Sequence, residues 1–174
     1  MEVEEGGTLE IEKKYRIKSL PVDLEQYACL QIEQGYLCKG PVVRIRKSNE
    51  NYILTYKAKT HLSEQEIGAK MSHEVELPLS EQAYYHLREK IDGRLVEKER
   101  YLIPLDNTLS AELDIFHGYL EGLRIVEVEF ASPEAVEAFE PPDWFGEDVT
   151  LDRRYTNSYL STITSWEEVK EVTI

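Results

Sequence analysis

The sequence predicts an α+β protein: an antiparallel β-barrel of about eight strands with a charged lumen, covered by a few helices. Seven segments alternate charged and apolar residues, and most of them carry two like charges at positions i and i+2. Successive side chains of a strand point to opposite faces, so this pattern gathers the charges on one face of a sheet. The acidic and basic pairs balance in number although the chain has a net charge of −14, which indicates a self-compensated interior.

The predicted strands follow the alternation in order along the chain. They span residues 9–17, 42–47, 52–59, 73–79, 96–102, 111–117 and 125–130. In the first of them Glu10, Glu12 and Lys14 share one face with Arg16, and mostly apolar residues occupy the other face. Residues 49–51 are typical of a hairpin turn between the second and third strands.

Four segments between or after the strands predict helices. The first spans residues 21–30, and the second begins after Ser80 as N-cap and ends near Ile91, before Gly93. Ser132 and Pro133 open a third helix to about residue 139, and residues 152–162 predict a fourth. The polar residues 61–70 predict a loop.

Length and composition restrict the class of protein. The 174 residues suit one domain, residues 1–174, because no linker divides them. A strongly acidic chain is a poor binder of nucleic acid and of anionic membranes, so we expect neither partner. No signal peptide or apolar run of about 20 residues is present, and Cys29 and Cys38 predict free thiols, so we expect a cytoplasmic protein.

The repeated like-charge pairs indicate a site. A solvated outer face would explain any single strand, but like charges close together destabilise a sheet, and here they recur on most strands. Paired carboxylates bind hard divalent cations, and Arg and Lys bind phosphate oxygens. A lumen that carries both groups suits a metal-chelated polyphosphate.

The order of these residues resembles a known family. The matching residues are Glu10-Ile11-Glu12-Lys13-Lys14, Gln34-Gly35-Tyr36-Leu37, Arg44-Ile45-Arg46, Lys57, Lys98 with Arg100, Glu112 with Asp114, Glu127-Val128-Glu129 and Asp152-Arg153-Arg154-Tyr155-Thr156-Asn157. Together they resemble the CYTH superfamily, or triphosphate tunnel metalloenzymes, and in particular its short bacterial, tripolyphosphatase-like members. Lys59 and Arg16 fit the pattern less well.

The resemblance implies an eight-stranded antiparallel tunnel that binds a triphosphate and Mg²⁺ or Mn²⁺. The implied metal ligands are Glu10, Glu12, Glu127 and Glu129. The implied phosphate ligands are Lys14, Arg44, Arg46, Lys57, Lys98, Arg100 and Arg154. Glu74, Glu76, Glu112 and Asp114 would order these bases or help to hold a second metal, and Glu127, Glu129, Lys14 and Arg46 would be the catalytic residues.

The function expected from the resemblance is hydrolysis of a terminal phosphoanhydride, with inorganic triphosphate favoured over nucleoside or thiamine triphosphate. Two alternatives stay open. One is an adenylyl cyclase of the same superfamily, of the class IV type, and the other is a non-catalytic polyphosphate or nucleotide sensor. The expected partner is the small-molecule triphosphate, and the chain is expected to be a monomer or a homodimer.

Overall fold

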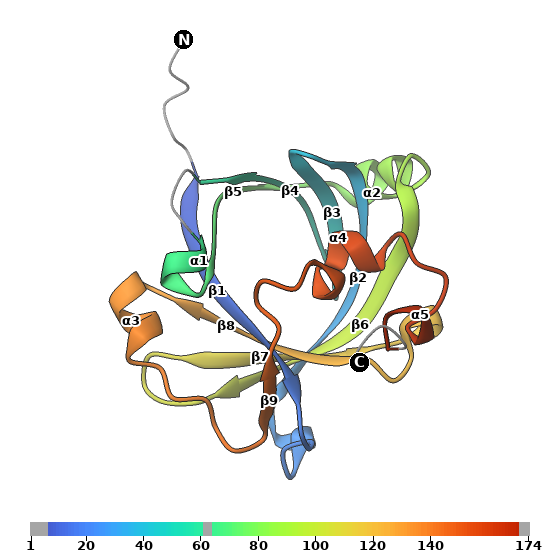
Figure 1. Cartoon of the computed structure of the whole chain (residues 1–174). Helices are drawn as coiled ribbons and strands as arrows, with labels where there is room; N and C mark the ends of the chain where they lie inside the picture. Colours follow the sequence, from blue (N-terminus) through green and yellow to red (C-terminus); the bar gives the residue numbers. More distant parts are fainter. Residues whose placement is uncertain (1–6, 61–63, 171–174) are drawn as a thin grey trace.

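The computed structural model describes residues 7–60 and 64–170, in which one antiparallel sheet curls into a closed barrel (Figure 1). The strands are β1 (Thr8–Ile17), β2 (Ala28–Lys39), β3 (Val42–Ser48), β4 (Asn51–Lys59), β5 (Lys70–Pro78), β6 (Asp92–Pro104), β7 (Ser110–Phe116), β8 (Arg124–Phe130) and β9 (Phe145–Asp148). Their order in the sheet is β5-β4-β3-β2-β6-β7-β8-β1-β9.

A pairing of β1 with β5 closes the ring. Residues Thr8 to Glu12 of β1 lie opposite Glu74 to Lys70 of β5, while β8 runs along the other edge of β1. Beyond this seam, β9 pairs with the end of β1. The predicted eight-stranded antiparallel barrel is therefore confirmed, with β9 as an additional strand.

All seven segments with charge alternation are strands, but β2 and β9 were not predicted from it. The helix predicted over residues 21–30 is wrong, because only the 3₁₀ turn η1 (Leu24–Gln26) is helical and β2 already begins at Ala28. The backbone groups of β2 pair with β3 on one side and β6 on the other, and these two ladders hold the segment extended.

The other helix predictions hold in part. Ser80 caps α2 (Glu81–Arg88) by accepting a hydrogen bond from the Ala83 amide at 3.1 Å, but α2 ends before Ile91 because β6 starts at Asp92. α3 (Pro133–Glu137) begins after Ser132 as expected. Residues 152–162 form two short pieces, η3 (Arg153–Tyr155) and α4 (Asn157–Leu160), and not one helix.

The segment predicted as a loop contains one helical turn. α1 (Glu64–Ile67) lies between β4 and β5, and residues 61–63 lie outside the described residues. The remaining short elements are η2 (Gly118–Leu120) and α5 (Glu167–Lys170). None of the helices in the described ranges is both long and apolar enough to cross a membrane.

Two apolar clusters hold the barrel together. The first lies on the outer face of β1, β7 and β8, where Tyr15, Val126 and Val128 pack near α3 and Phe145. The second lies at one end of the barrel. Its residues are Val96, Phe116, Leu120, Leu123, Ile125, Val149, Tyr155, Leu160, Ile163, Trp166 and Val169.

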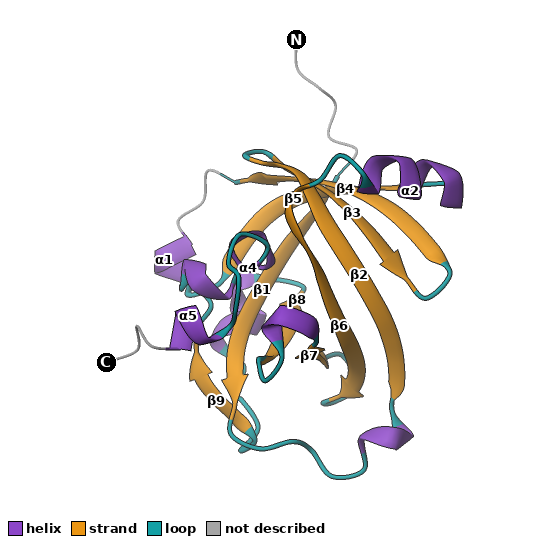
Figure 2. Cartoon of the chain, turned by 90° about the vertical axis from the view of Figure 1, so that its right-hand side faces the viewer, coloured by secondary structure: helices purple, strands orange, loops and turns teal. Residues whose placement is uncertain are grey.

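The second cluster shows that part of the helical cover lies at one end of the barrel. Val96, Phe116 and Ile125 occupy the same strand faces as the charged residues of β6, β7 and β8, yet they pack against the C-terminal segment, residues 149–169. In Figure 1 α4 lies inside the outline of the ring, and Figure 2 separates it from α2, which packs on β3 and β4. The C-terminal segment therefore closes one end of the lumen.

Candidate active site in the barrel lumen

The strand register puts the predicted site residues on one continuous face. Directly opposite one another lie Lys14 and Glu127, Arg100 and Asp114, and Lys57 and Glu74. Six charged side chains of this face are at most 7% exposed. They are Lys14, Arg44, Lys98, Arg100, Asp114 and Glu127. Buried charges at this density require partners, and the barrel supplies them from neighbouring strands.

Asp114 is the centre of the most buried network. Its carboxylate accepts two hydrogen bonds from Arg100, at 2.7 and 2.8 Å, and one from the Lys98 ammonium at 2.6 Å. Burial alone would raise the pKa of Asp114, but Arg100 and Lys98 hold it below its ordinary value. Burial lowers the pKa of Lys98 to about 8, although Asp114 opposes this shift.

Glu127 joins this network to β1. It accepts the Lys14 ammonium at 2.9 Å and one Arg100 guanidinium nitrogen at 3.2 Å. Although burial would raise the pKa of Glu127, Lys14 and Arg100 hold it well below its ordinary value. Arg100 also donates to Glu112 at 2.5 Å, so its N–H groups are directed at three carboxylates. Glu127 and Asp114 therefore hold the side chains of Lys14, Lys98 and Arg100 in place.

A second group of carboxylates lacks such compensation. Glu129 is exposed, yet loss of hydration and repulsion from Glu112 and Glu10 raise its pKa to about 8. Burial, followed by the charge of Glu127, raises the pKa of Glu12. Carboxylates that repel one another in this way are stabilised by a cation, and oxygen ligands suit Mg²⁺ and Mn²⁺.

The acidic group, which consists of Glu10, Glu12, Glu112 and Glu129, needs a rearrangement of its side chains to bind an ion. Within residues 7–60 and 64–170, no three His, Cys, Asp or Glu side chains are close enough together to hold a metal ion as they stand. Glu10 is drawn aside by an ion pair with Lys57, and Ser72 donates to it at 3.4 Å. The donor set therefore fits a hard divalent cation, provided that the side chains turn toward it.

The wall formed by β3 presents two arginines. Arg44 donates from Nη2 to the hydroxyl of Thr55 at 3.2 Å, whereas the described residues offer its buried Nε no acceptor. Arg46 donates to Gln34 Oε1 at 3.1 Å, and burial, then repulsion from Arg44 and Arg100, lowers its pKa to about 10. An arginine with an unused buried donor and a second one destabilised by neighbouring cations both favour a bound anion.

The C-terminal segment contributes two hydrogen-bond acceptors, from Tyr155 and Asn157, which match the family pattern but were given no role from the sequence. The Lys14 ammonium donates to the Tyr155 carbonyl oxygen at 3.2 Å, and the Lys98 ammonium donates to Asn157 Oδ1 at 3.3 Å. Thr150 also holds the backbone of Lys14, since its hydroxyl accepts from the Lys14 amide at 3.0 Å. Gln34, Thr55, Thr150 and Asn157 are neutral, so a search for charge pairs passes over them.

Comparison with known proteins agrees with this architecture. An inorganic triphosphatase of Nitrosomonas europaea is 39% identical over 155 residues, which cover 87% of this chain and 96% of that protein. A second inorganic triphosphatase, from Acetivibrio thermocellus, is 35% identical over 158 residues, which cover 87% and 92%. This chain belongs to the CYTH superfamily.

A solved structure has the same fold as this CYTH protein. The crystal structure of an inorganic triphosphatase, 35% identical, superposes with a TM-score of 0.65 over 90% of this chain and 96% of that one. No protein-family model matches the chain.

Some residues of the predicted set lie at the margin of this CYTH lumen or outside it. Arg154 pairs with Asp152, two residues away, at 2.6 Å, and the described contacts do not join it to the cations of the lumen. Glu76 is exposed and accepts from Thr55 at 3.5 Å, and Glu74 pairs with Lys57 at 3.2 Å.

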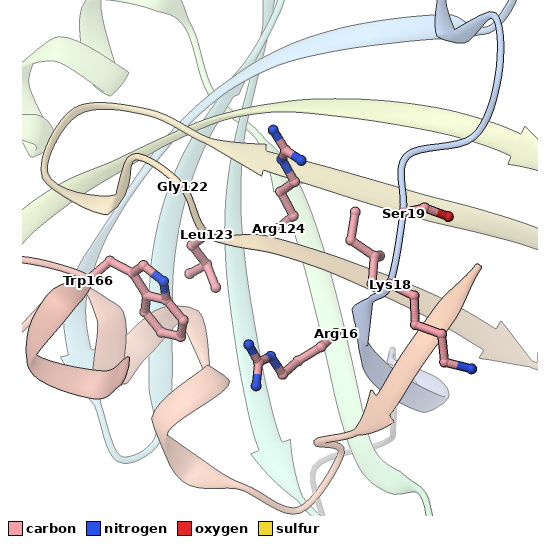
Figure 3. Close-up of a pocket in the computed structure, with 8 residues that line it drawn as sticks. Arg16, Lys18, Ser19, Gly122, Leu123, Arg124 and Trp166 are labelled. Atoms are coloured by element: carbon pink, nitrogen blue, oxygen red, sulfur yellow. The ribbon is translucent and has the colours of Figure 1, made fainter. Parts of the chain in front are cut away.

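Arg16 and Lys59 do not join the central network. Lys59 is exposed at the end of β4. Arg16 lines a separate cavity of about 170 Å³ with Lys18, Arg124 and Trp166. In Figure 3 the Arg16 side chain extends toward the indole of Trp166, whereas Arg124 points the other way. Both residues, which fit the family pattern less well, thus lie outside the central network.

Proposed function

We propose that this chain hydrolyses the terminal phosphoanhydride of inorganic triphosphate inside the barrel, with Mg²⁺ or Mn²⁺ as cofactor. The observation that supports this most directly is that the lumen carries buried cations and carboxylates side by side. Buried Lys and Arg side chains with unused donors lie beside carboxylates that repel one another. The two relatives named inorganic triphosphatase support the same activity.

The proposed metal ligands are Glu10, Glu12 and Glu129, with Glu112 adjacent. Their raised pKa values or their position in the acidic group favour a bound cation. A bound divalent ion offsets the charge that develops on phosphate oxygens during transfer. Glu127 has its charge balanced by Lys14 and Arg100, so we assign it to holding these cations in place.

The proposed phosphate ligands are Lys14, Arg44, Arg46, Lys57 and Lys98. Arg44 offers its buried Nε, and each lysine ammonium has three donors of which the protein uses only some. Arg100 is directed at Asp114, Glu112 and Glu127, so we assign it mainly to orienting them.

The reaction needs little covalent chemistry from the protein. Water attacks the terminal phosphorus, the bond from that phosphorus to the bridging oxygen breaks, and orthophosphate and pyrophosphate leave with one proton released. The cations of the cradle stabilise charge on the non-bridging and leaving oxygens, and the fixed lumen aligns the reactants. Glu129 lies at the acidic side and is the candidate to orient the attacking water.

We also propose a cytoplasmic location, as a monomer or homodimer. Cys29 and Cys38 are both free thiols on β2, which suits a reducing compartment. The strongly acidic chain, with pI near 4.8, does not favour nucleic acid as a partner.

The test is product analysis with triphosphate and ATP in the presence of Mg²⁺ or Mn²⁺. We expect orthophosphate and pyrophosphate from triphosphate. Glu129→Ala should lower kcat by about two orders of magnitude, whereas Glu147→Ala, an exposed acid outside the lumen, should not. Cyclic nucleotide and pyrophosphate from ATP would instead indicate a cyclase, and tight binding without turnover would indicate a sensor.

A further inference from the structure

The two lysines nearest the closed end of the barrel share one pattern of contacts. Lys14 lies between the carboxylate of Glu127, at 2.9 Å, and the carbonyl oxygen of Tyr155, at 3.2 Å. Lys98 lies between the carboxylate of Asp114, at 2.6 Å, and Oδ1 of Asn157, at 3.3 Å. Each ammonium is held by one charged oxygen from the barrel and one neutral oxygen from the C-terminal segment.

The local backbone explains how one short segment reaches both lysines. Thr156 is extended, with φ −78° and ψ 140°, and so separates η3 from α4. On either side of it, Tyr155 and Leu160 are buried in the apolar cluster that closes the barrel. The amide of Arg94 on β6 donates to the Ser161 carbonyl at 2.8 Å and fixes the end of α4. The segment is therefore anchored on both sides of Asn157.

The charged part of the lumen ends where the C-terminal segment packs on the barrel. On β6, β7 and β8 the position two residues beyond Lys98, Asp114 and Glu127 is apolar. These positions are Val96, Phe116 and Ile125, all at most 1% exposed, and they pack on the C-terminal segment. Asn157 and these three apolar side chains therefore lie together at the closed end of the lumen.

The unused N–H donors of Lys14 and Lys98 indicate what this arrangement does. An ammonium has three N–H donors, and among the described residues each of these two has one donor left after its carboxylate and its neutral oxygen. A neutral acceptor fixes the direction of the remaining N–H without cancelling the positive charge, whereas a second carboxylate would cancel it.

We infer that Asn157 and the Tyr155 carbonyl are positioning groups of the triphosphate site, which direct the free N–H of Lys98 and of Lys14 at a terminal phosphate. The closed end then restricts the substrates to triphosphates with a free end, which abuts this floor of the lumen. The inference rests on the proposed function for its ligand and adds two positioning groups to it.

The first test is calorimetric titration of triphosphate into the full chain in metal-free buffer, where turnover does not interfere. Asn157→Ala removes the acceptor of Lys98 and should weaken binding about fivefold. Asn157→Asp places a second carboxylate beside Lys98, which competes with phosphate, and should weaken binding about tenfold or more.

The matched control is Asn107→Asp, the same change of charge at an exposed turn position between β6 and β7. It should bind triphosphate like the wild type, and thermal melting should show all three variants folded at the assay temperature. Binding by both Asn157 variants that equals the wild type would overturn the positioning role. So would a loss of equal size in Asn107→Asp, or a wild-type chain that does not bind triphosphate.

The second test uses diadenosine triphosphate, which has three phosphates and no free end. We expect it not to displace triphosphate from the wild-type chain, and displacement at similar concentration would overturn the closed floor. These binding results are independent of turnover. A chain that binds as expected but hydrolyses nothing with Mg²⁺ or Mn²⁺ would refute the proposed function and leave the positioning role standing.

Discussion

Replacement of Asp114 by asparagine tests whether the lumen network stabilises the barrel. The fully buried carboxylate of Asp114 accepts three charge-assisted hydrogen bonds, from Lys98 and Arg100, at 2.6 to 2.8 Å. The neutral amide of the Asp114→Asn variant would leave two buried cations with less compensation, and breaking a buried pair costs about 3–5 kcal/mol. Because Glu112 and Glu127 still bind Arg100, we expect a loss of about 3 kcal/mol in the free energy of unfolding.

The assay is urea denaturation at neutral pH, with Glu147→Gln as the matched control. Glu147 pairs with Arg16 at 3.7 Å on the exposed surface, so its neutralisation should change stability by no more than about 0.5 kcal/mol. If Asp114→Asn loses no more than this control, the network does not stabilise the fold and the reasoning is wrong.

The pH dependence of the same variant provides a second check. The pKa of Asp114 in the folded chain is below its ordinary value, because Arg100 and Lys98 outweigh burial. Its contribution to stability is therefore complete above the unfolded pKa of about 3.9 and is lost as pH falls through the folded pKa. The stability gap between wild type and variant should close as pH falls through the folded pKa of Asp114.

Three further outcomes follow from other contacts. Because the folded pKa of Glu129 is raised to about 8, the free energy of unfolding without metal should fall as pH rises from about 5 to 8 and then level off. Addition of Mg²⁺, or the Glu129→Gln substitution, should make this fall smaller. Urea titrations at several pH values measure both effects. Gly93→Ala should lower the free energy of unfolding by about 2–3 kcal/mol, since the new Cβ would lie 2.4 Å from the backbone oxygen of Ser161. Gly122 also has a positive φ but lies in open space, so Gly122→Ala should lower it less in the same titration. Tyr84→Phe removes a 2.8 Å hydrogen bond to Glu33 and should lower the unfolding free energy by about 1–2 kcal/mol, and no loss would show that this bond does not help to dock α2.

The strands that carry charge pairs could be predicted because their two faces differ in kind. β2 could not be predicted in this way, although it lines the lumen between β3 and β6. Its residues on the lumen face include Ile32, Gln34 and Tyr36, which are apolar or neutral, so no charge alternation marks it. β9 has only four residues, too few for a period of two to stand out.

Some residues of the candidate site could likewise be predicted from the sequence, and others could not. Lys14, Arg100 and Asp114 could be found because a charge on a strand face is visible in the sequence. Tyr155 and Asn157 act through neutral oxygens and lie 141 and 59 residues from their lysines. Nothing local in the sequence connects such partners, since the contact exists only once the C-terminal segment has packed on the barrel. The same packing explains why residues 152–162 bend into two short turns where periodicity indicated one helix.

The five-residue seam between β1 and β5 links formation of the barrel to ligand binding. Glu10 and Glu12 belong to that seam, and the partner of Glu10 there, Ser72, is 62 residues away. Strand pairing over such a separation is slow because the intervening chain loses entropy before contacts compensate for it. The seam also brings Lys57 of β4 to Glu10 of β1, so a ligand that binds residues on both sides of the seam selects the closed ring over a sheet with β1 and β5 apart.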